Sequence, residues 1–111
     1  MTRLPMSPAA CGLLRALLAR CGGERDRILL IDFRSVDWQS LTFVGERHEI
    51  LLKLVGPNPD PVARLLLEGL NEEELEVRGH VVADICRVGE LTRASDGSLE
   101  VRLEALTLRS D

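Results

Sequence analysis

Histidine is the side chain best suited to proton transfer near neutral pH, and this chain has two, His48 and His80. The first lies in the stretch GERHEI, residues 45–50, beside an arginine and two glutamates. The second opens the stretch HVVADIC, residues 80–86, which also holds an aspartate and a cysteine. Brought together, such groups could bind a metal ion or act as an acid–base pair. The strands that carry them decide whether they meet.

The alternation of side chains along two expected strands separates the histidines. In the strand expected at 46–55, His48 shares a side with Ile50, Leu52 and Leu54, opposite Arg47 and Glu49. In the strand expected at 75–91, the helix-facing set is predicted to be Leu75, Val77, Val81, Ala83 and Ile85. The opposite side would carry His80, Val82, Asp84 and Cys86. We therefore expect no metal site, no catalytic pair and no cofactor.

The sequence contains no Gly-rich phosphate loop, G-x-S-x-G elbow, C-x-x-C or H-E-x-x-H motif. Asp84 follows His80 by about 13 Å of strand, too far for a hydrogen bond. No helix N-terminus lies near Cys86 to lower its pKa, so we expect an inert thiol. We expect His48 at the rim of the core, with its nitrogens bonded to backbone or water. An enzyme is the less favoured class, and a catalytic or ligand role for His48 stays open.

The composition is that of a small globular protein. Of 111 residues, 45% are hydrophobic and 29% are charged, so we expect one α+β domain over residues 1–111. Aromatic residues make up 3%, so the core must be aliphatic. Nucleic-acid binding needs a cationic surface and stacking rings, whereas this chain has a net charge of −4 and few rings. Nucleic acid is therefore not an expected partner.

Three cysteines, Cys11, Cys21 and Cys86, match no metal-ligand spacing. Cys11 and Cys21 would lie about 15 Å apart along one helix, too far for a disulfide. We expect free thiols in a reducing cytoplasm. The apolar N-terminal stretch is too short to span a membrane, so no membrane partner is expected. A single lysine against 13 arginines indicates a GC-rich bacterial genome.

The N-terminal segment has two interpretations. Three arginines, beginning with Arg3, precede the first acidic residue, Glu24, as in a transit peptide. The same segment has the limits of a helix, since Ser7-Pro8 can cap and start it and Gly22-Gly23 can end it. We expect a helix, and whether residues 1–23 are ever cleaved is left open. Its apolar stripe would be Leu14, Leu17, Leu18 and Cys21.

Hydrophobic periodicity predicts the other elements. A long strand over 28–43 should bend or bulge near 35–38. Asp60 should cap, and Pro61 start, a short helix with Val62, Leu65, Leu66 and Leu70 on one stripe. The other three strands are expected at 46–55, 75–91 and 99–108, the last two joined by a turn at 94–98.

The resulting order, α-β-β-α-β-β, suggests a four-stranded antiparallel sheet with both helices on one face. Moving the first strand of a ferredoxin-like fold to its C-terminus gives this order, because the first and last strands of that fold are antiparallel neighbours. The predicted sheet order is then 3-4-2-1, with a right-handed crossover between strands two and three. A plain order of 1-2-3-4 is the alternative.

The first half of strand three is expected to form an unpaired edge. With a turn centred near residues 95–97, the hairpin partner of residue 80 would fall beyond the end of the chain. An apolar edge invites pairing with a second copy or another protein, unless charged neighbours such as Glu74, Glu76 and Arg78 guard it. The candidate interface residues are Leu75, Val77, His80 and Val82.

Trp38, the single tryptophan, lies in a polar run. It can close one end of the core or anchor a ligand or subunit. The favoured function is a non-catalytic binding or assembly module that homodimerises through its sheet or the strand-three edge. One alternative is an enzyme or small-molecule-binding protein with a pocket near Trp38 and His48. Another is an accessory subunit of a larger complex.

Overall fold

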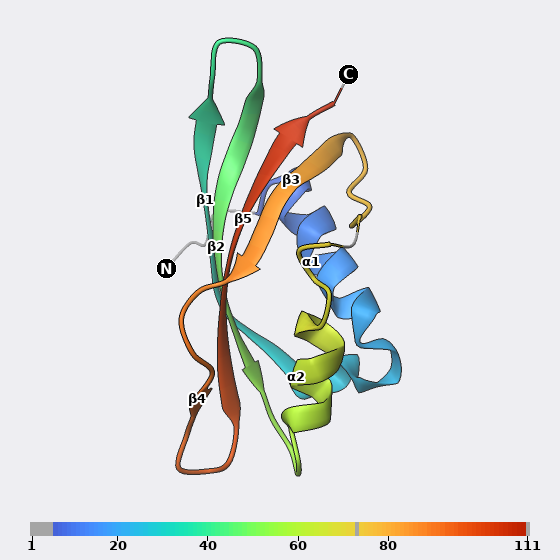
Figure 1. The fold of residues 1–111 in the computed structure, drawn as a ribbon, viewed down its shortest axis with the longest axis vertical. Helices are drawn as coiled ribbons and strands as arrows, with labels where there is room; N and C mark the ends of the chain where they lie inside the picture. Colours follow the sequence, from blue (N-terminus) through green and yellow to red (C-terminus); the bar gives the residue numbers. More distant parts are fainter. Residues whose placement is uncertain (1–5, 73, 111) are drawn as a thin grey trace.

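The computed structural model of this chain describes residues 6–72 and 74–110, and Figure 1 shows their arrangement. Helices α1 and α2 lie on one face of an antiparallel sheet, so the predicted α+β class is confirmed. Arg3 lies outside the described residues. The elements are α1 (Pro8–Arg20), the 3₁₀ helix η1 (Gly22–Arg27), β1 (Ile28–Gln39), β2 (Val44–Leu54), α2 (Asp60–Leu67), β3 (His80–Arg87), β4 (Thr92–Arg93) and β5 (Leu99–Arg109).

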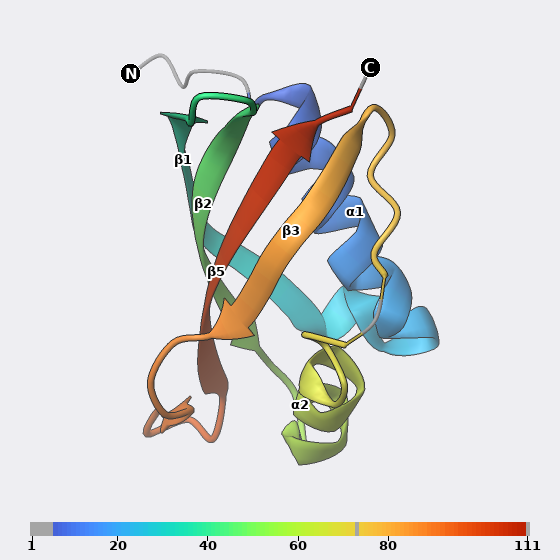
Figure 2. The ribbon, with the colours of Figure 1, turned by 45° about the horizontal axis from the view of Figure 1, so that its top comes forward.

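Across the described residues the sheet has five strands rather than the expected four. Its order is β1-β2-β5-β3, and the short β4 pairs with β5 alongside β3. Every neighbouring pair is antiparallel, so β2 and β3, which both flank β5, run parallel to each other. The connection between them carries α2 across the same face that α1 covers (Figure 2).

Helix α1 begins where its sequence predicts. The Ser7 hydroxyl accepts a hydrogen bond from the backbone N–H of Ala10 at 3.1 Å, and Pro8 is the first helical residue. The buried side is centred on Leu13 and Leu17, while Leu14 is only half-buried. The helix is therefore rotated slightly from the predicted stripe.

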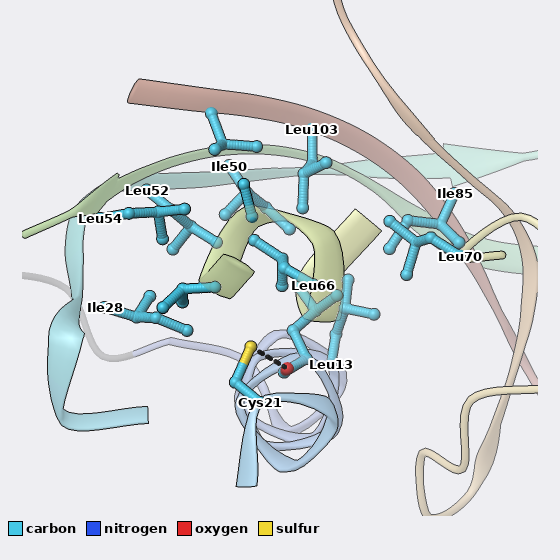
Figure 3. Packing of buried hydrophobic residues seen from close by; sticks show 14 of the residues in the cluster. Leu13, Cys21, Ile28, Ile50, Leu52, Leu54, Leu66, Leu70, Ile85 and Leu103 are labelled. Carbon is cyan, nitrogen blue, oxygen red and sulfur yellow. Dashed lines mark hydrogen bonds between the residues drawn. The ribbon is translucent and has the colours of Figure 1, made fainter. Parts of the chain in front are cut away.

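Helix α2 is shorter than its apolar pattern suggested. Asp60 is its first residue rather than its cap, and the helix ends at Leu67. Leu65 is 47% exposed, while the small Ala63 packs inward in its place. Leu70 still reaches the core, from the turn that follows the helix (Figure 3). The core is aliphatic, as expected, and lies between the two helices and the sheet.

The bulge in β1 is not where the sequence suggested. It lies at Ile31, between Leu30 and Asp32, whereas the pairing of residues 32–39 with β2 is regular. The prediction near residues 35–38 is wrong because polar Ser35 has a partner inside the protein. Its hydroxyl bonds to His48 on the neighbouring strand, so the polar residue does not need to leave the ladder.

Strand β3 starts at His80, five residues later than predicted. The preceding segment turns back at Gly79, which has a φ of 78°, a conformation open to glycine. Val77 forms an isolated bridge with His80 and is 5% exposed. A methyl group built on Gly12 of α1 would lie 2.8 Å from the Val77 side chain. Val77 therefore packs against α1, and residues 75–79 do not extend β3.

The paired length of β3 also differs from the expectation. His80 pairs with Arg109, so the first residues of β3 do have a mate within the chain. The hairpin pairing that a turn near residues 95–97 predicts is formed by β4 instead of β3, since Thr92 pairs with Glu100. Val88 still donates its N–H to the Arg102 carbonyl at 2.8 Å, but residues 89–91 leave the ladder before β4, and this slides β3 along β5.

A second bulge, at Ala83, reverses the face assignment at the start of β3. Val82 pairs with Thr107, a helix-face residue, and Val81 pairs with Leu108 on the open face. The prediction that His80 and Val82 face away from the helices is therefore wrong. The reason is that one extra residue inverts the alternation on one side of a bulge.

Gly45 lies on β2 directly beside the backbone of β5, and its replacement is a test of this packing. A Cβ at Gly45 would overlap the backbone carbonyl of Thr107. We expect Gly45→Ala to lower the free energy of unfolding by about 1–3 kcal/mol, the usual range for overpacking. Urea denaturation measures the change. Gly23→Ala, at an exposed site with no atom within 4 Å of the new methyl group, is the matched control and should change stability by less than about 0.5 kcal/mol.

Candidate functional site

His48 is a fully buried structural link rather than a histidine at the rim of the core. Its Nδ1 lies 2.7 Å from the Ser35 hydroxyl on β1, and its Nε2 lies 2.8 Å from the Thr107 hydroxyl on β5. Phe33 meets the ring edge-on, with centroids 5.7 Å apart. Both ring nitrogens therefore have side-chain partners, and the imidazole joins three adjacent strands.

Burial lowers the pKa of His48 from its usual value of 6.5, because a charged ring is poorly solvated there. The Glu46 carboxylate opposes this shift, and the charge of His80 adds to it. A neutral imidazole has one N–H and one lone pair, so it donates to one hydroxyl and accepts from the other. The folded protein thus favours neutral His48.

The Ser35–His48 pair resembles a nucleophile beside a base, but its surroundings do not complete such a site. The far nitrogen of the ring meets the neutral Thr107 hydroxyl, where a catalytic base would need a carboxylate to stabilise its charged form. The hollows found in the described surface are lined by other residues. The contacts of His48 are those of a core histidine.

His80 is half-buried and does not join a metal site. Its Nδ1 lies 3.1 Å from the Arg78 carbonyl oxygen, and its side chain lines an open groove of about 1260 Å³ between α1 and residues 74–82. Asp84 and Cys86 point to the opposite face of the sheet. Within residues 6–72 and 74–110, no three His, Cys, Asp or Glu side chains are placed to hold a metal ion.

Trp38 lies on the face of the sheet that the helices leave open. Its cross-strand neighbour on β2 is Gly45. His48 is three residues from Gly45 and faces the helices. Trp38 and His48 therefore lie on opposite sides of the sheet and cannot line one pocket.

The open face divides into an apolar end and a charged end. Two neighbouring rows across the strands contain most of its apolar side chains: Trp38, Gly45, Leu108 and Val81 in one, and Val36, Arg47, Leu106 and Asp84 in the next. The rows beyond them are mainly charged: Arg34, Glu49, Glu104 and Cys86, then Asp32, Leu51 and Arg102. A hollow of only about 150 Å³ lies among the charged rows.

The apolar end continues onto the hairpin that joins β1 to β2. Leu41 is completely exposed, and Phe43 is 52% exposed. Val36 and Val81 are 62% and 54% exposed, while Trp38 is half-buried. We call Val36, Trp38, Val81, Leu106 and Leu108 the open-face cluster. Sequence patterning identified Trp38 but missed its companions, because only the observed register shows which side of each strand they share.

The three cysteines are free thiols. Cys11 and Cys86 are exposed, whereas Cys21 is buried and points toward the core. Burial raises the pKa of the Cys21 thiol, although the nearby Arg20 charge acts in the opposite direction. The buried thiol is therefore less reactive than an ordinary cysteine.

Comparisons with family models, curated proteins and solved structures found no match for this chain. No described helix is long and apolar enough to cross a membrane. The function of this protein must therefore be inferred from the geometry of the molecule.

The buried histidine predicts a pH-dependent stability. Because the pKa of His48 is lower in the folded state than the unfolded value of about 6.5, the unfolded chain binds the proton first as the pH falls. We expect the free energy of unfolding to be highest above pH 6.5 and to decrease as the pH drops toward the folded pKa of His48. Urea titrations at a series of pH values measure this decrease.

Replacement of the ring tests the assignment. His48→Phe should remove this pH dependence and lower the free energy of unfolding by about 1–3 kcal/mol, because Ser35 and Thr107 lose their partner. His80→Asn is the control and should retain most of the pH dependence. An unchanged pH profile in His48→Phe would show that another group causes the effect.

Proposed function

We propose that this protein is a non-catalytic binding module that assembles with a second copy of itself through its sheet. The observation that carries the proposal is the open-face cluster, on a sheet face that no described helix covers. Scattered exposed apolar residues are ordinary, whereas a contiguous set around a tryptophan is typical of an interaction surface.

The surroundings of the open-face cluster favour a protein partner over a small molecule. Apolar side chains stand on a broad strand surface, and the adjacent rows supply paired charges for a polar rim. Ligand pockets, by contrast, are concave and enclose most of their ligand. A pocket shared by Trp38 and His48 is disfavoured because the sheet separates them.

The strand-three edge is the less suitable surface of the two considered from the sequence. Val77 is buried in the chain's own core, and Leu75 and Val82 are half-buried. His80 lines the groove beside α1. These placements favour the rest of the sheet as the assembly surface.

The arrangement also supports a relationship to the ferredoxin-like topology. The four longer strands lie in the order β1-β2-β5-β3, with α1 and α2 on one face. We propose that this sheet is the circularly permuted form, in which a β3–β5 connection joins the strands that are terminal in the unpermuted fold. The additional β4 is then an elaboration of that connection.

Free thiols on the surface support a reducing cytoplasm as the site of action. The arginine-rich composition supports a bacterial source. An accessory role in a larger complex is the alternative to self-assembly, since another protein could cover the same cluster. The two differ in whether the purified chain alone associates.

Light scattering coupled to size exclusion, across the micromolar range, tests self-assembly. We expect the mass of a dimer, with dissociation on dilution. Trp38→Ala should weaken the dimer at least about 30-fold, because a central tryptophan typically contributes 2 kcal/mol or more. Leu65→Ala, which shortens an exposed apolar side chain on α2, is the control and should leave the dimer intact. A monomer at every concentration would refute the proposal.

A further inference from the structure

The outer edge of β1 is available to another strand. β1 is the first strand in the sheet order, and along residues 32–39 no described helix or strand lies on its outer side (Figures 1 and 2). Its pairing with β2 is uninterrupted over these eight positions. The other edge, β3, is broken by a bulge after only three paired residues. A bulge protects an edge from pairing, so β1 offers the better template.

Two hydrogen bonds near the ends of β1 show which of its backbone N–H and C=O groups point away from β2. Near one end, the N–H of Val55 donates to the carbonyl of Arg27 at 2.9 Å. At the other, the N–H of Ser40 donates to the carbonyl of Phe43, also at 2.9 Å. In an antiparallel ladder the bonded positions alternate, so the odd-numbered residues of β2 bond to β1 throughout. The groups of residues 33, 35, 37 and 39 therefore point away from β2.

Two copies related by a two-fold axis can pair only in registers that place one residue opposite itself. We infer that the second copy pairs antiparallel with this edge about Val36, so that Arg34 of each copy lies opposite Trp38 of the other. This inference rests on the proposed self-assembly and names the strand that mediates it. Residues 35 and 37 then exchange backbone hydrogen bonds across the axis, and Val36 faces its own copy in a non-hydrogen-bonded pair.

Side-chain chemistry and the end of β1 at Gln39 select this register from its neighbours, since centring the pair on Trp38 would set Val36 against Ser40, beyond the strand. The Arg34 side chain is 72% exposed on the open face, where its Nε donates to the Asp32 carboxylate at 2.9 Å, and the flat face of its guanidinium can lie over the indole ring of the other copy. Centring the pair on Arg34 or Asp37 would instead place like charges opposite each other. Centring it on Ser35 would set the Asp32 carboxylate against the indole ring. Centring it on Phe33 would bring the pairing into the bulge at Ile31.

The inferred pair joins the two sheets into one, with both helix layers on the same side. The two-fold axis is then perpendicular to the sheet, and the two open faces become one continuous surface. The Val36 side chains of the two copies meet at its centre, and Trp38 of each copy, two residues further along the strand, lies against Arg34 of the other. Two members of the open-face cluster, Val36 and Trp38, thus lie at the junction, whereas Leu106, Leu108 and Val81 remain on the shared open face.

Disulfide trapping measures the register directly. In a background carrying Cys11→Ser and Cys86→Ser, which removes both exposed thiols, Val36→Cys should form a covalent dimer under mild oxidation. A self-facing non-hydrogen-bonded pair brings Cα atoms to about 4.5 Å, within the range of a disulfide. Arg34→Cys is the matched control. Its two copies would be about 13 Å apart along the strands and should not cross-link.

Arg34→Gln in the wild-type chain gives a second readout. It should weaken the dimer about 5- to 30-fold, because the symmetric pair holds two exposed cation–π contacts, whereas Arg102→Gln on the same face should not. Cross-linking of Arg34→Cys instead of Val36→Cys, or of neither in a protein that sediments as a dimer, would overturn the β1 pairing and leave the proposed self-assembly standing. A monomeric protein would overturn both.

Discussion

The hydrogen bonds of one buried side chain fix the register of three strands. His48 belongs to β2, and its two ring nitrogens reach Ser35 on β1 and Thr107 on β5. A shift of either neighbour by one residue would carry its hydroxyl to the other face and leave a buried imidazole nitrogen without a partner. The aliphatic core packs against the same strands, but aliphatic contacts tolerate sliding and exchange more readily than two short directional bonds do. The histidine therefore selects one strand register, whereas the apolar side chains alone favour burial without fixing the register.

Much of the architecture follows from local rules in the sequence. The cap at Ser7 and the break at residues 56–59 set where helices begin, because proline and capping side chains act within a few residues. Alternation correctly placed His48 on the helix-covered side of β2, because that strand is regular throughout. The α+β class and the aliphatic core needed no more than these patterns and the composition.

The errors arose where the chain departs from a fixed period. A bulge at Ala83 inverts the sides of the residues before it, and nothing in the local sequence separates Ala83 from an ordinary strand residue. The segment before Gly79 resembles a strand, yet Val77 is held against α1, a contact distant in sequence. The open-face cluster was missed for the same reason, since its members come from β1, β3 and β5. Local patterns describe each strand, whereas a surface depends on how the strands align.

The interaction that closes the core also preserves the free edge of β1. Polar residues within an edge strand commonly mark a bulge or the end of the strand, and Ser35 and Asp37 therefore suggested a bulge in β1. Because Ser35 is bonded to His48, the backbone there remains in register with β2 through residue 39. The regular stretch extends past the helix-covered core and carries Arg34, Val36 and Trp38 outward on the open face. The buried Ser35–His48 hydrogen bond, on the helix-covered side of the sheet, thus keeps β1 regular where it carries the open-face cluster. The same bond therefore supports both the stability of the fold and the proposed assembly.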